Sequence, residues 1–151
     1  MAQSLGKVYI HLIFHIKTTS VRMCEKDLEH IHSYMGKTIN DMGCQSICVG
    51  GVDDHVHILF ILSRDKAISK VVEEVKRHSS RWIKSQGQPY AGFEWQGGYA
   101  VFSVSQSVVE ATRTYILNQK EHHKRVSFVD EYQQFLELYK VAYNEQFVFR
   151  D

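Results

Sequence analysis

The sequence predicts an α+β fold of the ferredoxin-like, split βαβ type, in which helices pack on one face of an antiparallel sheet. Three observations predict it. Apolar runs typical of strands alternate with two amphipathic helix patterns in the order strand, helix, strand, strand, helix, strand. The two middle strands are joined across glycines and aspartates, as in a hairpin. Two more helix patterns close the chain, and they are expected to form a C-terminal helical extension.

The first strand is expected over residues 8–16, a β-branched and aromatic run that is apolar on both faces apart from His11 and His15. Such a strand belongs at the centre of a sheet. A helix follows over residues 25–42, and Gly43 is expected to end it. The apolar positions of this helix recur at spacings of three and four, at Leu28, Ile31, Met35 and Ile39.

The hairpin strands are expected over residues 46–52 and 55–62, with an irregularity at Gly50 and Gly51. The second of these strands ends in residues that are apolar on both faces, so it too should lie inside the sheet. A second helix is predicted over residues 66–85. Its buried stripe consists of Ile68, Val71, Val72, Val75 and Trp82.

A fourth strand is predicted over residues 93–104, irregular around the two glycines within it. Ser107 is then expected to cap a third helix over residues 108–124, with Glu110 completing a capping box. A last helix is expected over residues 130–139. The sequence contains no internal repeat and no low-complexity segment, which favours a single compact unit.

Length and composition are those of one ordinary globular domain, over residues 1–151. No apolar run approaches the roughly 18 residues needed to span a bilayer, and the segment from Met1 to Lys7 lacks the pattern of a signal peptide. We therefore expect a cytoplasmic protein with no membrane partner. The net charge of +1 argues against coating of nucleic acid through bulk charge, although it leaves a local basic face open.

The cysteines Cys24, Cys44 and Cys48 are odd in number and are not spaced as a paired framework. In a reducing cytosol they are expected to be free thiols. Cys44 and Cys48 lack a second pair of His or Cys residues at zinc-finger spacing, which argues against a structural zinc site.

The motif Asp54-His55-Val56-His57 begins the second hairpin strand. Alternation along a strand places His55 and His57 on the same face, with Val56 turned toward the core. Two imidazoles so placed can reach one divalent cation, but the site then needs a third ligand from elsewhere. The alternative is a pair of hydrogen-bonded histidines at the start of a strand.

A second group of residues lies on the third predicted helix. Tyr115 and Gln119 are four residues apart and therefore share a helix face. The carbonyl oxygen of Gln119 is a hard ligand suited to magnesium or manganese, and the phenol of Tyr115 can act as a covalent nucleophile. The alternative for Tyr115 is packing in the core or at its boundary.

Taken together, these two groups and the segments around them resemble the single-tyrosine transposases of the HUH nuclease superfamily, the TnpA proteins of insertion sequences that move as single strands. The resemblance covers nearly the whole chain. It extends over the opening strand, residues 51–57, residues 95–105, the helix with Tyr115-Ile116-Leu117-Asn118-Gln119 followed by His122 and His123, and the closing residues 131–136 and 143–145. The paired histidines are a weak signal alone, but with Tyr-x-x-x-Gln downstream they are fairly specific.

The resemblance implies an enzyme, a DNA transposase that cuts and rejoins single-stranded DNA. It implies that His55, His57 and Gln119 hold Mg²⁺ or Mn²⁺ and that Tyr115 is the nucleophile. Attack by Tyr115 on phosphorus would give a 5′-phosphotyrosine and a free 3′-hydroxyl, and a second 3′-hydroxyl could reverse the step without ATP. A nearby cation should assist deprotonation of a phenol whose ordinary pKa is about 10.

The implied partners are single-stranded DNA with hairpin ends and a second copy of the chain, because members of the family are typically dimers. Whether Tyr115 works beside the histidines of its own chain or of its partner stays open. Basic residues on the second and third helices could line a surface that follows the phosphates: Lys76, Arg77, Arg81, Arg113, Lys120 and Lys124. A solvated helix face is the alternative for each of them.

Two other functions stay open. One is a catalytically silent nucleic-acid-binding module with a ferredoxin-like fold, against which the complete set of His55, His57, Tyr115 and Gln119 argues. The other is a domesticated relative that processes repeated palindromic DNA in its host genome. The sequence alone does not separate such a relative from the transposase of a mobile element.

Overall fold

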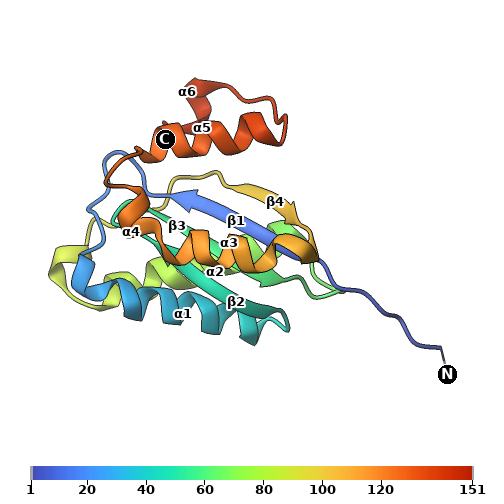
Figure 1. Cartoon of the computed structure of the whole chain (residues 1–151). Coiled ribbons are helices and arrows are strands. Elements are labelled where there is room, and N and C mark those ends of the chain that lie inside the picture. Colours follow the sequence, from blue (N-terminus) through green and yellow to red (C-terminus); the bar gives the residue numbers. More distant parts are fainter. Residues whose placement is uncertain (1, 151) are drawn as a thin grey trace.

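A four-stranded antiparallel sheet is the centre of the computed structural model, which describes residues 2–150 (Figure 1). The strands are β1 (Tyr9–His15), β2 (Gln45–Gly51), β3 (His55–Ile61) and β4 (Ala100–Val104). They follow the order β2-β3-β1-β4. The two strands with apolar residues on both faces, β1 and β3, therefore lie inside the sheet as predicted, and the strand order confirms the ferredoxin-like arrangement.

Helices α1 (Leu28–Asp41) and α2 (Ile68–Ser85) cover one face of the sheet. Every second residue of β1 and β3 points toward these helices, as Phe14 and Phe60 do, and is buried there. The predicted apolar stripes of the helices meet these side chains at Ile31, Met35, Ile39, Val71, Val72 and Val75. The spacing of apolar residues by three and four thus accounts for the orientation of both helices.

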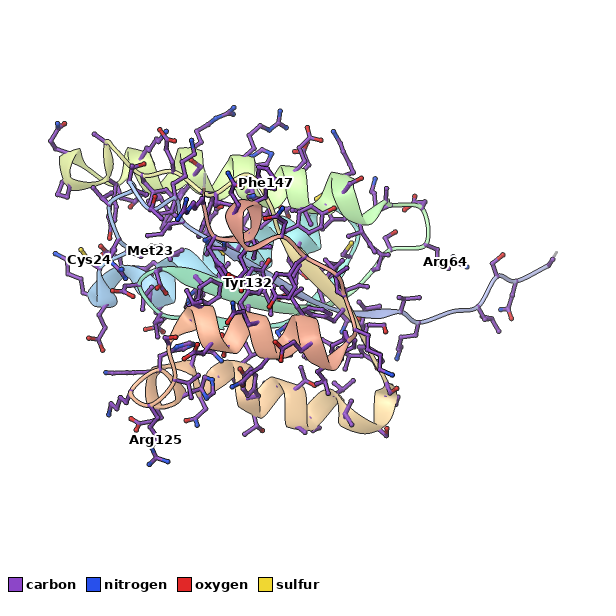
Figure 2. All side chains as sticks on the ribbon, turned by 90° about the horizontal axis from the view of Figure 1, so that it is seen from above. Met23, Cys24, Arg64, Arg125, Tyr132 and Phe147 are labelled. Atoms are coloured by element: carbon purple, nitrogen blue, oxygen red, sulfur yellow. The ribbon has the colours of Figure 1, made fainter. Side chains whose placement is uncertain are left out.

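The C-terminal helices cover the opposite face of the sheet. They are α3 (Val109–Leu117), α4 (Gln119–His122), α5 (Phe128–Leu138) and α6 (Glu145–Val148). Ile116 of α3 packs with Leu59 of β3, while Tyr132 of α5 packs with Ile13 and Phe102. Seen from above, α5 lies over the sheet between α3 and α6 (Figure 2). The predicted C-terminal extension is therefore a third layer that buries the second face of the sheet.

Local features of the chain differ from the prediction at three places. The third predicted helix is interrupted at Asn118, which ends α3 and precedes α4 with φ −99° and ψ 19°. Ser107 does not cap it, because Gln106–Val108 forms a 3-10 turn and α3 begins without a side-chain cap. The irregularity in the hairpin falls between Ser46 and Cys48 and not at the glycines.

The fourth strand is shorter than the predicted one. Continuous pairing with β1 is confined to Ala100–Val104, and the preceding segment contributes a single bridge between Trp95 and Ile16. The expectation of free thiols is confirmed for Cys24, Cys44 and Cys48. Among the helices of residues 2–150, none is both long and apolar enough to cross a bilayer.

Gly50 of β2 sets how closely α3 approaches the sheet. A Cβ added at Gly50 would overlap the carbonyl oxygen of Ile116 and would lie 3.0 Å from its Cγ2. Gly50 is also the register partner of His57 in β3. The absence of a side chain at this one position therefore lets the helix with Tyr115 lie directly against the strands next to the paired histidines.

We predict that Gly50→Ala lowers the free energy of unfolding by about 1–3 kcal/mol, the usual cost of overpacking a filled interior, because α3 must move away from β2. Urea unfolding followed by circular dichroism measures this change. Gly97→Ala is the control, since a Cβ added at Gly97 meets nothing within 4 Å. Equal unfolding midpoints for the two variants would contradict the close approach of α3.

Candidate active site

Four histidines lie on the sheet face that the C-terminal helices cover. Because alternate residues of a strand share a face, His11 and His15 of β1 point to the same side as His55 and His57 of β3. His15 is directly across from His55, and Ile13 is across from His57. All four histidines are buried, so their ring nitrogens need partners inside the protein.

His57 has a hydrogen-bond partner at each ring nitrogen. Its Nε2 lies 3.0 Å from Oε1 of Glu131, and its Nδ1 lies 2.8 Å from Nε2 of His11. Because an ionised carboxylate only accepts, Nε2 of His57 donates to Glu131, and Nδ1 accepts from His11. Burial lowers the pKa of His57 to about 4 against the opposing effect of Glu131. The ring is therefore neutral near pH 7, which is the form that binds metals.

His55 is oriented by the carboxylate of its neighbour in sequence. Its Nδ1 lies 2.7 Å from Oδ1 of Asp54, while its Nε2 lies 2.9 Å from Oε1 of Gln119 and 3.3 Å from Oε1 of Glu131. Burial lowers the pKa of His55, but the hydrogen bonds to Asp54 and Glu131 outweigh burial and raise the pKa to about 9. A carboxylate on Nδ1 is the usual partner of a histidine whose other nitrogen binds a metal.

Tyr115 and Gln119 are brought to the histidines by the packing of α3 and α4. Gln119 is only 1% exposed, and its Nε2 lies 3.2 Å from Oε2 of Glu131. The hydroxyl of Tyr115 donates to the same oxygen, and the Tyr115 ring meets the His57 ring edge-on with 5.8 Å between centroids. The four residues singled out in the sequence, which are His55, His57, Tyr115 and Gln119, therefore form one cluster within a single chain.

Glu131 of α5 lies at the centre of this cluster. The residue is 1% exposed, and its carboxylate contacts every member of the cluster: His55, His57, Tyr115, Gln119, His122 and His123. Burial raises the pKa of this carboxyl group, but hydrogen bonds from His123, His55 and His57 outweigh burial and hold the pKa far below its usual range. In the sequence, Glu131 lies in the closing part of the family resemblance, which implies no role for it.

His122, the last residue of α4, and His123 directly after it contact the same cluster. The Nε2 of His123 lies 2.8 Å from Oε1 of Gln119 and 3.2 Å from Oε1 of Glu131, and its Nδ1 lies 2.8 Å from the Val126 carbonyl oxygen. The Nε2 of His122 lies 3.1 Å from Oε2 of Glu131. In the sequence they belong to the family resemblance, three and four residues after Gln119, and the resemblance implied no role for them.

The donor atoms of this cluster fit a divalent cation. One ring nitrogen each of His55 and His57 and one carboxylate oxygen of Glu131 lie within 4.8 Å of one another, and Oε1 of Gln119 is 2.9 Å from the same nitrogen of His55. Imidazole nitrogens together with amide and carboxylate oxygens suit Mn²⁺ or Mg²⁺. These nitrogen and oxygen atoms are hydrogen-bonded to one another in this structure. Their lone pairs could be directed at one ion instead.

The surroundings of Tyr115 favour its neutral phenol over the phenolate. Burial, and then the nearby negative charge of Glu131, raise the pKa of Tyr115 far above its ordinary value. A cation bound between His55 and His57 would act in the opposite direction, because positive charge favours the phenolate.

The six basic residues predicted to contact DNA fall into two groups on opposite sides of the sheet. Arg113, Lys120 and Lys124 are exposed on or next to α3 and α4, on the side of the histidine cluster. The other group lies on α2 and comprises Lys76, Arg77 and Arg81. The ammonium group of Lys76 is half-buried and donates to the carbonyl oxygens of Gln96 and Gly98.

Comparisons with known proteins give a family and a fold. Residues 4–119 match the model of the family described as IS200-like transposases. The crystal structure of a candidate transposase from Deinococcus radiodurans R1 is 23% identical with a TM-score of 0.61, and the match covers 79% of this chain and 98% of that chain. The structure of a REP-associated tyrosine transposase bound to a REP hairpin is 13% identical with a TM-score of 0.60, covering 83% and 74%. No curated protein matches the sequence.

We predict that Mn²⁺ stabilises the folded chain and that this effect requires His57. At a free concentration of about 100 times Kd, a ligand of the native state adds about 2.7 kcal/mol, which for this size corresponds to roughly 5–10 °C in Tm. Thermal unfolding with Mn²⁺ or with EDTA measures the difference. The shift should grow with pH up to about 9, because the cation must displace the proton that His55 holds with a pKa of about 9.

The matched control for this prediction is His78→Ala. His78 lies on α2, bonded to Glu74 and remote from the cluster, so this variant should keep the full Mn²⁺-dependent shift. His57→Ala should lose it, whatever its own stability without metal. An equal shift in both variants would place the ion elsewhere.

Proposed function

The chain belongs to the IS200-like transposase family, and we propose that it is a metal-dependent enzyme that cuts and rejoins single-stranded DNA through a 5′-phosphotyrosine on Tyr115. The observation that carries the proposal is the position of the Tyr115 hydroxyl. It bonds to one oxygen of a carboxylate whose other oxygen contacts His55 and His57. The proposed nucleophile and the proposed cation ligands therefore belong to one cluster of contacting side chains.

The residues that would hold the cation are His55, His57 and Gln119. When bound, Mg²⁺ or Mn²⁺ would draw charge from the scissile phosphate and favour the phenolate over the phenol. The chain itself orients the ligands: Asp54 is bonded to His55 and His11 to His57. With Nε2 of His57 turned to an ion, its Nδ1–H would donate to His11, so the same contact supports both states.

In the cleavage step the Tyr115 oxygen forms a bond to phosphorus, and the bond between phosphorus and the 3′-oxygen breaks. The phenolic proton passes to solvent, and the departing 3′-oxygen takes up a proton from solvent to become a hydroxyl. The phosphodiester energy is kept in the phosphotyrosine, so attack by another 3′-hydroxyl rejoins DNA ends and returns Tyr115 to a phenol. A free 3′-hydroxyl and a protein-bound 5′ end are the products that transposition of a single-stranded element requires.

The cluster is complete within one chain, since Tyr115 reaches Glu131, and Glu131 reaches His57, without a second copy. This supports action of Tyr115 in cis. The homodimer expected from the family resemblance stays a prediction, and it is not needed to assemble these residues.

The proposed substrate is single-stranded DNA with hairpin ends. Support for it comes from the structural neighbour, a tyrosine transposase bound to a REP hairpin. On this chain, Arg113, Lys120 and Lys124 are exposed on the side of the cluster, where they could follow the phosphates leading to Tyr115. Lys120 is paired with Glu25 of the 3-10 turn before α1 and would exchange this exposed partner for a phosphate.

We predict that the protein forms a covalent adduct with labelled single-stranded DNA from the flanks of its own gene, and that Tyr115→Phe abolishes the adduct because no oxygen remains to bond phosphorus. A denaturing gel with Mg²⁺, Mn²⁺ or EDTA measures it. Tyr99→Phe is the matched control, since Tyr99 is partly exposed and lies outside the cluster. Binding without cleavage would favour the silent module, and cleavage that survives Tyr115→Phe would mean attack by water.

A further inference from the structure

We propose that Glu131 is a further ligand of the cation and that the same carboxylate holds the hydroxyl of Tyr115 beside it. The inference rests on the proposed function and deepens it. It adds to the predicted ligands a residue of α5, which lies outside the residues that match the family, 4–119.

The burial of Glu131 is the first argument. A carboxylate that is 1% exposed is costly unless its charge is matched. In the part of the chain that the structure describes, its hydrogen-bond and ion-pair partners are histidines, Tyr115 and Gln119, with no lysine or arginine among them. Tyr115 and Gln119 offer hydrogen bonds only, and an imidazole carries no permanent charge. A divalent cation at this point would place fixed positive charge directly against the carboxylate.

The two oxygens of Glu131 face different partners, which is the second argument. Oε1 lies 3.0 Å from Nε2 of His57 and 3.3 Å from Nε2 of His55, on the side where the ligand atoms converge. Oε2 accepts from the Tyr115 hydroxyl and lies 3.2 Å from Nε2 of Gln119. Oε1 can therefore exchange its hydrogen bonds for a bond to the ion. Oε2 can at the same time keep its hydrogen bond from the Tyr115 hydroxyl, which holds Tyr115 beside the ion.

The ligand set gains charge by this addition. Neutral imidazoles of His55 and His57 and the amide of Gln119 bring none, whereas Glu131 brings one negative charge to a divalent ion. Carboxylate oxygen is also a ligand that both Mg²⁺ and Mn²⁺ prefer. The carboxylate would therefore tighten binding of either ion.

Helix α5 holds Glu131 in place from both sides. Ser127 caps the helix by accepting from the Asp130 backbone, and the Glu131 backbone N–H donates to the Ser127 carbonyl over 3.0 Å. The next residue, Tyr132, and then Leu136 are buried against the sheet. A ligand on a capped and packed first turn is positioned with little freedom.

If Glu131 binds the ion, metal occupancy and the docking of α5 are coupled. The ion would join β3, which carries His55 and His57, to α5 through a bond that the metal-free chain replaces with hydrogen bonds. The backbone of α5 should then open less often when metal is present.

The first test is calorimetric titration of Mn²⁺ into the full chain, the Glu131→Gln variant and the Glu137→Gln variant. Glutamine keeps the shape of Glu131 but removes its charge, and its amide nitrogen donates where one carboxylate oxygen accepted. Glu137 is an exposed glutamate of the same helix. We expect Glu131→Gln to weaken Mn²⁺ binding about 10- to 100-fold and Glu137→Gln to leave it unchanged. Affinities of Glu131→Gln and of the unaltered chain within about twofold of each other would overturn the proposal.

The second test uses the unaltered chain and does not depend on a variant that folds. Hydrogen exchange of α5 amides should slow when Mn²⁺ is added, while amides of α2, on the opposite face of the sheet, should not change. Mn²⁺ binding that leaves α5 exchange unchanged would overturn the proposal.

Failure of the inference and failure of the proposed function are distinguishable. A Tyr115 adduct that forms equally well in Glu131→Gln, with equal Mn²⁺ affinity, would overturn the role of Glu131 and leave the function standing. Weaker Mn²⁺ binding in Glu131→Gln would support Glu131 as a ligand. If the unaltered chain then forms no adduct with DNA, the proposed function would be overturned while the role of Glu131 stands.

Discussion

The carboxylate of Glu131 is buried against the imidazoles of His55 and His57, and the rest of the structure depends on keeping these polar groups satisfied without water. Each has partners inside the protein: Asp54 for one imidazole, His11 for the other, and the hydroxyl of Tyr115 for the carboxylate. A buried polar cluster that lost one partner would cost more than the hydrogen bond itself. This is why residues from β1, β3, α3, α4 and α5 have to meet at one point.

That requirement explains the arrangement of the layers. Helices α1 and α2 complete an apolar core on one face and contribute nothing to the cluster, whereas the C-terminal helices seal the face that carries the histidines. Gly50 lets α3 approach β2 closely, and the interruption at Asn118 starts a new helix with Gln119 as its first residue. The extension beyond the family-matched residues 4–119 is then part of the cluster, because it carries the carboxylate that contacts Tyr115, His55 and His57.

The sequence could predict what depends on local periodicity. Alternation placed His55 and His57 on one face, and a spacing of four related Tyr115 to Gln119. It could not predict the role of Glu131, because the approach of α5 to β3 is a tertiary event and nothing in the spacing between Gln119 and Glu131 records it. The predicted capping box at Ser107 was wrong for a local reason. A 3-10 turn, Gln106–Val108, precedes α3, and the helix begins without a side-chain cap.

The central claim is that the histidines of β3 and the residues of α4 and α5 form one metal centre beside Tyr115. Diffraction at the manganese absorption edge from crystals grown with Mn²⁺ tests it most directly. We expect one anomalous peak at coordination distance, roughly 2.0–2.4 Å, from Nε2 of His55 and of His57, on the side of these rings that faces the Tyr115 hydroxyl. A peak at another part of the chain, or none while His57 stays bonded to Glu131, would contradict it.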